Sequence, residues 1–370
     1  MPQTTLSGSA WNLRAALRRI TDTVDVGIDD QAAVRMALKL VHGHYRDGQF
    51  GSSWTNSRLT DAYLARSLRR GTRRAGASGP LDAVLMVNAL TTFDQPFFVY
   101  YDSSWDALMA SAENPARYAR MRRLRPATMM ARRDFQVSVY KSATRVFASS
   151  HWLKRCLVTQ SGLAPGQVQV VHPGGAPRVN DPAIVRARIA GPRRKILAVS
   201  RIYELSDFYR KGLDLVVDAV GILRRDYDPE ITLTVAGLAT WPLPGGPPDG
   251  VDFLGVVPPG EVPGLYDTHH VYVMPSRMEP FGLVFAEAQS RGMPVVARNA
   301  YAMPEMVAPG VSGALIDKDD PAELAAAIAG VLASDEIYEQ CAVRAPAMAR
   351  YFSWERMAAE VAGHIGAAAG

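Results

Sequence analysis

Ten short apolar runs recur along the chain and alternate with stretches of helical periodicity. Four lie in the first half, at 82–87, 97–101, 144–149 and 167–171, and six in the second, at 195–200, 231–236, 251–254, 271–275, 294–297 and 313–316. Runs that are apolar on both faces are typical of parallel strands covered by helices on both sides. With intervening helices such as 212–225, 283–291 and 321–333, they predict an α/β fold of two doubly wound, Rossmann-like sheets.

A Gly/Pro-rich segment, HPGGAPRVNDP at 172–182, divides the two groups of strands. We therefore expect an N-terminal domain over 1–175 and a C-terminal domain over 176–351, each with its own core, as a length of 370 residues allows. Apolar residues at helical spacing from Phe352 onward predict an amphipathic helix over 352–370, which we assign to the N-terminal domain.

Charge is unevenly distributed between these halves. Residues 1–175 carry 23 Lys and Arg against 12 Asp and Glu, whereas the remainder carries 18 against 24. The basic excess is concentrated at 66–74 and 117–133. It indicates either a solvated arginine-rich face or a surface for an anionic membrane or substrate. Nucleic acid is not an expected partner, because none of the recognition motifs is present.

The sequence has no apolar run near the roughly 18 residues of a membrane span. Its two cysteines, Cys156 and Cys341, have no metal or redox spacing, which fits a reduced compartment. We expect a cytoplasmic protein that is at most peripheral at the inner membrane face. A nicotinamide dehydrogenase is disfavoured, since no G-x-G-x-x-G follows any predicted strand, and a P-loop is absent.

The segment MPSRMEPFGLVFAEAQSRGMPVV, at 274–296, carries the clearest functional signal. It follows a strand at the carboxyl edge of a predicted parallel sheet, where open α/β sheets bind ligands. Gly282 opens a helix whose first amides suit a phosphate, and we expect that helix to run to about Arg291. Glu287 lies in an apolar helix, where a carboxylate is costly unless paired. The alternative is an exposed helix glutamate beside a loop acid, Glu279.

This segment resembles the retaining family-4 glycosyltransferases of GT-B fold, whose signature is E-x7-E within an E-P-F-G-L…E-A…G-x-P-V-V run. The resemblance extends over about 145 to 360 and includes 303–316, with Glu305 and Gly313. It implies two Rossmann-like domains facing a cleft. It also implies that Glu279 contacts the donor sugar, that amides of Phe281, Gly282 and Leu283 contact sugar and phosphate, and that Glu287 holds the ribose.

The stretch 200–219 is similar to the G-R…K-G stretch of that family, in which both bases hold the diphosphate. The resemblance assigns this role to Arg201 and Lys211, and such a clamp replaces a metal ion. We therefore expect no metal and no cofactor. The interval is longer than usual by about ELSDFY, so Arg210 is an alternative to Lys211, and two plain surface bases are another interpretation.

The N-terminal domain matches less closely. Gly8 is a candidate for close approach to the diphosphate, with a simple capped helix after Ser9 as the alternative. On the acceptor side, Asp102 stands where many relatives have His-Asp, and His151 follows another strand. A turn aspartate and a helix-start histidine are the alternatives. His172 belongs to the hinge pattern of the family and is expected to be structural.

These features together predict a retaining glycosyltransferase that moves a sugar from a nucleotide-diphosphate sugar to a hydroxyl acceptor, which is a glycan, a lipid or a small molecule. Glu279, Arg201 and Lys211 are its expected catalytic residues. Another GT-B enzyme, such as a sugar phosphorylase or nucleotide-sugar epimerase, and a non-catalytic sugar-nucleotide- or lipid-binding subunit remain alternatives.

The residues before Gly8 read MPQTTLS, in which Leu6 is the sole large aliphatic residue after Met1. In the family an apolar central strand stands at this place, and a polar lead cannot replace it. We expect the chain to be short at its N-terminus, with no full-length strand before Ser9 and no central strand over 22–28.

Overall fold

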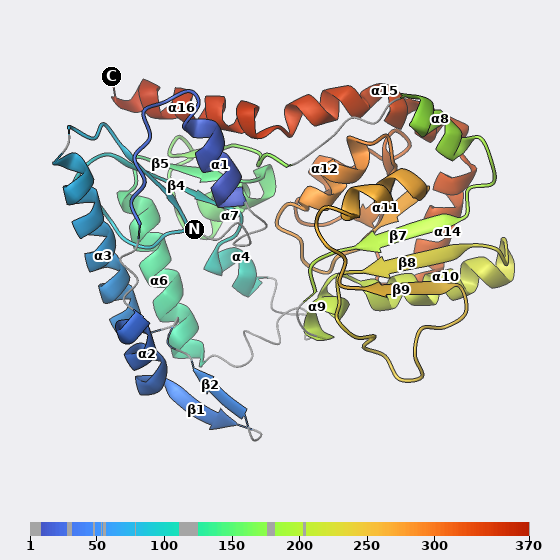
Figure 1. Cartoon of the computed structure of the whole chain (residues 1–370), viewed down its shortest axis with the longest axis horizontal. Coiled ribbons are helices and arrows are strands. Elements are labelled where there is room, and N and C mark those ends of the chain that lie inside the picture. The colour runs from blue at the N-terminus through green and yellow to red at the C-terminus, as the bar shows by residue number, and fades with distance from the viewer. Residues whose placement is uncertain are drawn as a thin grey trace.

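The computed structural model describes residues 9–27, 32–46, 49–52, 54, 57–77, 79–110, 125–175, 182–202 and 205–369. Within them the chain forms two parallel β-sheets that lie in separate halves of the molecule, each covered by helices (Figure 1). The predicted α/β class with two parallel sheets is confirmed. A short antiparallel hairpin of β1 (Gly43–Arg46) and β2 (Gln49–Ser52) lies outside both sheets and is not predicted by the sequence pattern.

The N-terminal sheet has the strand order β3-β4-β5-β6, and its pairs are parallel. Its strands lie within the four predicted runs and are β3 (Val84–Val87), β4 (Phe97–Tyr101), β5 (Arg145–Ala148) and β6 (Val168–Val170). Phe98, Val99 and Phe147 are fully buried, as expected for strands covered on both faces. The helices of this half are α1 (Ser9–Leu17), α2 (Ala32–Val41), α3 (Arg58–Gly76), α4 (Trp105–Ala110), α6 (Pro126–Ser142) and α7 (His151–Thr159).

The C-terminal sheet has the order β12-β11-β10-β7-β8-β9, again with parallel pairs. Its strands match the six predicted runs and are β7 (Lys195–Val199), β8 (Thr232–Ala236), β9 (Val251–Gly255), β10 (Val271–Val273), β11 (Val295–Arg298) and β12 (Gly313–Ile316). The helices are α8 (Pro182–Ile189), α9 (Leu205–Arg210), α10 (Leu213–Asp226), α11 (Val262–Thr268), α12 (Leu283–Gln289), α13 (Met303–Met306), α14 (Pro321–Ala333) and α15 (Asp335–Tyr351).

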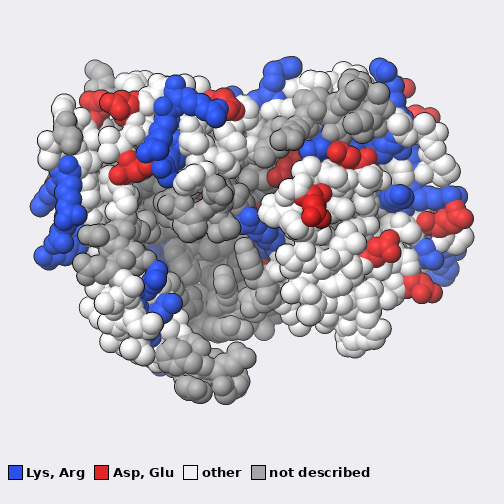
Figure 2. Space-filling model, in the orientation of Figure 1, with Lys and Arg blue, Asp and Glu red and all other residues white. Residues whose placement is uncertain are grey.

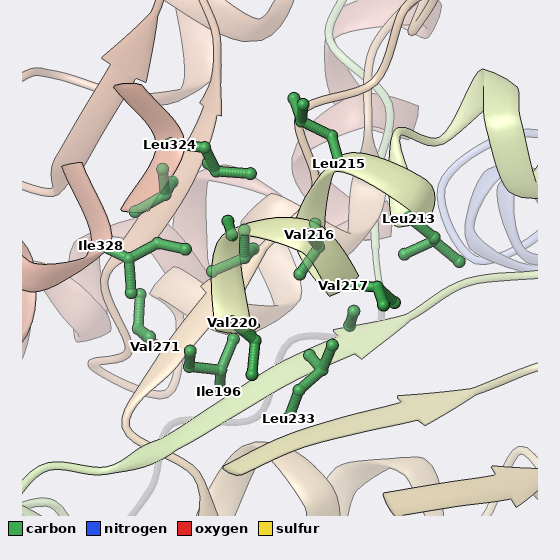
Figure 3. Close-up of a cluster of buried hydrophobic side chains, with 14 of the residues drawn as sticks. Ile196, Leu213, Leu215, Val216, Val217, Val220, Leu233, Val271, Leu324 and Ile328 are labelled. Atoms are coloured by element: carbon green, nitrogen blue, oxygen red, sulfur yellow. The ribbon is translucent and has the colours of Figure 1, made fainter. Parts of the chain in front are cut away.

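The core of this half is built by α10 and α14 against one face of the sheet. Figure 3 shows Val220 of α10 directed at Ile196 and Leu233 of the sheet, with Ile328 of α14 near Val271. All five side chains are essentially inaccessible to solvent. Burial of side chains of this kind stabilises a fold by about 1.5–3 kcal/mol each, and it gives the candidate site a rigid base.

The last helix, α16 (Trp354–Ala369), leaves the C-terminal half and packs on the N-terminal half (Figure 1). Met357 and Val361 of α16 share a buried cluster with Leu13 of α1 and Phe147 of β5. The chain therefore crosses between the halves twice, once near 175 and once at the end of α15.

The expectation of a missing N-terminal strand concerns two segments. Residues 2–7 lie outside the described residues, as does the candidate Gly8. Residues 22–27 form no strand in the structure.

Candidate functional site

The site predicted from the sequence lies where β7 and β10 pair at the centre of the C-terminal sheet. From β7 the chain continues outward through β8 to β9, and from β10 it continues outward in the opposite direction through β11 to β12. This reversal of strand order opens a crevice at the carboxyl ends of β7 and β10, where α/β proteins bind ligands. The loop after β7 carries Arg201, and the loop after β10 carries Glu279 and Gly282. Figure 2 shows Lys and Arg side chains at the boundary between the two halves.

Lys211 and Glu279 are brought into direct contact at this place. The Lys211 Nζ donates a hydrogen bond of 2.6 Å to Glu279 Oε2. Only 12% of the lysine side chain and 9% of the glutamate side chain are exposed. Burial lowers the pKa of Lys211, and the charge of Glu279 opposes that shift. The pair thus places one positive and one negative group, both poorly hydrated, at the ligand edge of the sheet.

Gly282 forms the start of α12 in a left-handed conformation, with φ 87° and ψ 65°. A Cβ here would lie 2.5 Å from the Phe285 ring and 3.2 Å from Glu279 Cγ, so glycine is required both for the backbone and for the space. The helix runs over Leu283–Gln289, which ends it two residues before the expected Arg291. Gly292, with φ 65°, forms the turn that follows.

Glu287 is partly buried in α12, as its apolar neighbours predict, and it has a partner that the sequence did not indicate. Its Oε2 accepts a hydrogen bond of 3.0 Å from the hydroxyl of Tyr266 in α11. Burial raises the pKa of Glu287, while the Tyr266 hydrogen bond and the charges of Arg291 and Arg201 act in the other direction. Arg201 is exposed, and its field reaches Glu287, so these two predicted residues lie near one another.

Asp102 approaches the site from the N-terminal half, where it follows β4. Its side chain has solvent access, yet the surrounding protein is dense enough that lost hydration raises its pKa to about 6. The negative charge of Glu279 contributes to the same shift. The carboxyl groups of Asp102 and Glu279, which come from different halves, therefore interact electrostatically, as residues that face a shared cleft would.

His151 lies at the first position of α7, and its backbone rather than its ring makes the contact between the halves. Glu305, from α13, accepts hydrogen bonds from the His151 amide at 2.8 Å and the Trp152 amide at 2.6 Å. Partial burial would raise the pKa of Glu305, but the side chain of His172 and these two amide bonds together lower it. A carboxylate of one half thereby caps a helix of the other.

His172, in the segment that joins the halves, lies beside this contact. Its Nδ1 is 2.8 Å from the Tyr351 hydroxyl, and its Nε2 is 3.6 Å from Glu305 Oε2. Within the described part of the chain, His151, His172 and Glu305 are the one group whose ligand atoms lie close enough for a metal. Both Glu305 oxygens already accept amide hydrogens, so the group fits a structural joint better than a metal centre.

Of the additional residues, LSDFY belong to α9, which ends at Arg210 and places Lys211 directly after it. Arg210, the alternative base, donates to Asp207 at 3.0 Å and to the Met278 carbonyl at 3.3 Å, so its guanidinium braces the loop. A buried ion network around Arg277 also lies here. No sequence signal indicates it, because its acidic partners are 42 and 63 residues away.

An apolar pocket of about 560 Å³ opens at the carboxyl ends of β7, β8 and β9. Ile202, Leu238, Trp241 and Val256 contribute to its lining, which contains no charged residue. Since Ile202 follows Arg201 directly, the pocket adjoins the predicted basic clamp and suits an aromatic or aliphatic part of a ligand.

Residues 185–348 match the family described as glycosyl transferases, group 1. A D-inositol 3-phosphate glycosyltransferase from Segniliparus rotundus is 34% identical over 212 residues, which are 52% of this chain and 45% of the relative. The chain spans about half the length of the curated relatives it matches.

Solved structures extend the likeness to both halves. Sucrose-phosphate synthase from Thermosynechococcus elongatus has a TM-score of 0.65 at 19% identity, covering 96% of this chain and 91% of the other. Anabaena HepE, solved in complex with UDP-glucose, has a TM-score of 0.58 at 18% identity and covers 84% of each chain. The fold is therefore the GT-B fold of glycosyltransferases.

Proposed function

We propose that the protein is a metal-independent glycosyltransferase that moves a sugar from a nucleotide-diphosphate donor to a hydroxyl acceptor and retains the anomeric configuration. The observation that carries the proposal is the placement of Lys211, Glu279, Gly282 and Glu287 together at the crevice between β7 and β10. Two carboxylates, one base and an open backbone turn at one ligand edge are what a sugar and a diphosphate need.

The roles follow from the chemistry of each group. Lys211 and Arg201 stabilise the negative charge that develops on the departing diphosphate, and this is the main source of rate acceleration. The first amides of α12, after Gly282, contact phosphate and sugar. Glu287 accepts hydrogen bonds from the ribose hydroxyls, and Glu279 accepts them from the donor sugar. Departure breaks the bond from the anomeric carbon to the phosphate oxygen, and the acceptor oxygen then bonds to that carbon on the same face.

Asp102 is the acceptor-side group of the proposal. With a pKa of about 6 it is mostly ionised at pH 7 and is a stronger base than an ordinary aspartate, which suits a group that receives a proton from an attacking hydroxyl. The UDP-glucose complex of the similar Anabaena structure supports a nucleotide-sugar donor. Metal independence rests on the two bases, since they supply the charge that a divalent cation would otherwise provide.

A peripheral position at an anionic membrane is the second part of the proposal. Among the described residues, no helix combines the length and apolarity of a membrane-crossing segment. The predicted basic arm at 117–133 is described only from 125 onward. There Arg132 pairs with Asp61 at 2.6 Å and Arg133 with Asp106 at 2.8 Å, so part of its charge is neutralised within the protein. Exposed arginines of α3 remain, and Figure 2 shows basic side chains along that outer edge.

The test is binding followed by turnover. Thermal unfolding with a panel of nucleoside diphosphates and nucleotide sugars, in the presence of EDTA, should raise the midpoint for one base series, since a ligand that binds only the native state stabilises it. Lys211→Ala should remove most of that stabilisation. Lys195→Ala, at the opposite end of β7, is the matched control and should retain it. No stabilisation by any member of the panel would overturn the proposal.

A further inference from the structure

A buried guanidinium belongs to the same loop as Glu279. Arg277, in the loop after β10, is 6% exposed. Its Nη1 and Nη2 donate to the two oxygens of Asp214 at 2.7 and 2.8 Å, and its Nε donates to Asp319 Oδ2 at 2.7 Å. The planar guanidinium thereby joins the first turn of α10 to the loop that follows β12.

The same residue also joins two backbone segments. Its Nη1 donates to the Tyr209 carbonyl at 2.5 Å, and its own amide donates to the Arg210 carbonyl at 2.8 Å. Gly212 lies against the loop as well, because a Cβ there would be 2.6 Å from the Pro275 carbonyl oxygen. The segments 209–214 and 275–279 are therefore held together along their length.

Asp319 is itself braced from another strand. Arg298, at the end of β11, hydrogen-bonds to its Oδ1, and the two guanidinium groups lower the pKa of Asp319 although partial burial would raise it. Two cations thus balance two carboxylates in a network that reaches the carboxyl ends of three strands. Buried ion pairs add little to stability compared with apolar side chains of similar volume, so geometric precision is the better reason for such a network.

Lys211 and Glu279 lie on the two segments that Arg277 joins. Lys211 stands between Tyr209 and Asp214, and Glu279 follows Arg277 by two residues. We propose that Arg277 is the positioning residue of the site. It fixes the geometry of the Lys211–Glu279 contact, and it keeps segments 209–214 and 275–279 in place when Lys211 exchanges Glu279 for a diphosphate. This inference rests on the proposed function for the identity of the ligand. Lysine cannot replace Arg277, because its single ammonium cannot serve two carboxylates and a carbonyl in one plane.

The first experiment is a double-mutant cycle on UDP binding, measured by calorimetry. We expect Arg277→Lys and Asp319→Asn each to weaken binding, by about tenfold for Arg277→Lys. In a Lys211→Ala background the same changes should alter affinity less than about twofold, because they act through the lysine. Arg224→Gln, at the other end of α10 and bonded to the Ile231 carbonyl, is the matched control and should leave affinity unchanged. Additive effects in the cycle would show a role in general stability and overturn the proposal.

A second measurement needs no ligand. Acylation of lysines by an amine reagent, followed by peptide mass spectrometry, compares Lys211 with the exposed Lys195 in the same chain. We expect the Lys211:Lys195 rate ratio to rise severalfold in Arg277→Lys and Asp319→Asn and to stay constant in Arg224→Gln. An unchanged ratio in folded Asp319→Asn would overturn the proposal. If the wild-type chain bound no nucleotide, the proposed function would fail while this measurement still tested Arg277.

Discussion

The ammonium group of Lys211 and the carboxylate of Glu279 are bonded to each other at 2.6 Å in the crevice where the proposed diphosphate must bind. A phosphate and Glu279 therefore compete for the same cation. Binding of the donor exchanges a lysine–carboxylate bond for a lysine–phosphate bond and leaves Glu279 free to accept hydrogen bonds from a sugar. Both halves of this exchange can be measured.

Glu279→Gln should raise affinity for UDP while lowering sugar transfer. In the wild type the phosphate must displace a charge-assisted hydrogen bond between Lys211 and Glu279, which contributes about 1.5–3 kcal/mol. The substitution removes this competing charge, so UDP binds more tightly. The loss in transfer arises because the amide is a weaker acceptor for the sugar hydroxyls. Calorimetry with UDP and a single-turnover assay check the two effects, with Glu339→Gln on exposed α15 as the control. Weaker UDP binding by a folded Glu279→Gln protein would contradict the competition.

Glu287→Ala should weaken the binding of the free nucleoside diphosphate and of the nucleotide sugar to the same extent. The ribose is common to both ligands, and loss of one charge-assisted hydrogen bond corresponds to about 1.5–3 kcal/mol. Tyr266→Phe removes the hydroxyl that orients the carboxylate, so its effect should be smaller and in the same direction. Circular dichroism verifies the fold, and unchanged affinity for both ligands would exclude the ribose role.

The stability of the protein should show a pH dependence that belongs to Asp102. Its folded-state pKa of about 6 lies above the usual 3.8, so the native state binds this proton more strongly than the unfolded chain does. The stabilisation is complete below about pH 4 and is lost as pH rises through 6. Relative to Asp102→Asn, the wild-type unfolding midpoint should rise as pH falls from 7 to 5. The control is Asp94→Asn, at an exposed carboxylate, and parallel curves for wild type and Asp102→Asn would refute the assignment.

Most strands were predictable because they are short, largely apolar runs, as parallel strands covered on both faces require. β1 and β2, GHYR and QFGS, carry neither a continuous run nor an apolar alternation, so no sequence rule selects them. The six-residue α9 is likewise not predicted by the sequence pattern, since a helix of that length depends on tertiary contacts such as the buried Phe208.

Among the candidate residues, Lys211 and Glu279 were predictable because a linear motif carries each of them. Tyr266 and Arg277 were not, because their roles depend on partners in other elements. The Tyr266 hydroxyl meets Glu287 from a separate helix, and Arg277 meets Asp214 only after the sheet has brought β7 and β10 together. A motif indicates which side chains touch a ligand, whereas the groups that orient them become visible in the folded chain.

The final prediction concerns the membrane-facing part of the proposal. α2 leaves an apolar side uncovered, with Met36 59%, Leu40 65% and Val41 69% exposed, and it carries Arg35 and Lys39. A basic amphipathic helix with an open apolar face is suited to the interface of an anionic bilayer. Met36→Ser combined with Leu40→Ser should therefore lower sedimentation with phosphatidylglycerol-containing vesicles. Val343→Ser, at a 78% exposed position of α15, is the matched control and should not change it.

Binding of the wild type should also fall steeply with salt, because charges at the surface are screened within about 8 Å at physiological ionic strength. Equal binding to neutral and anionic vesicles would instead identify the arginine-rich side as a solvated face.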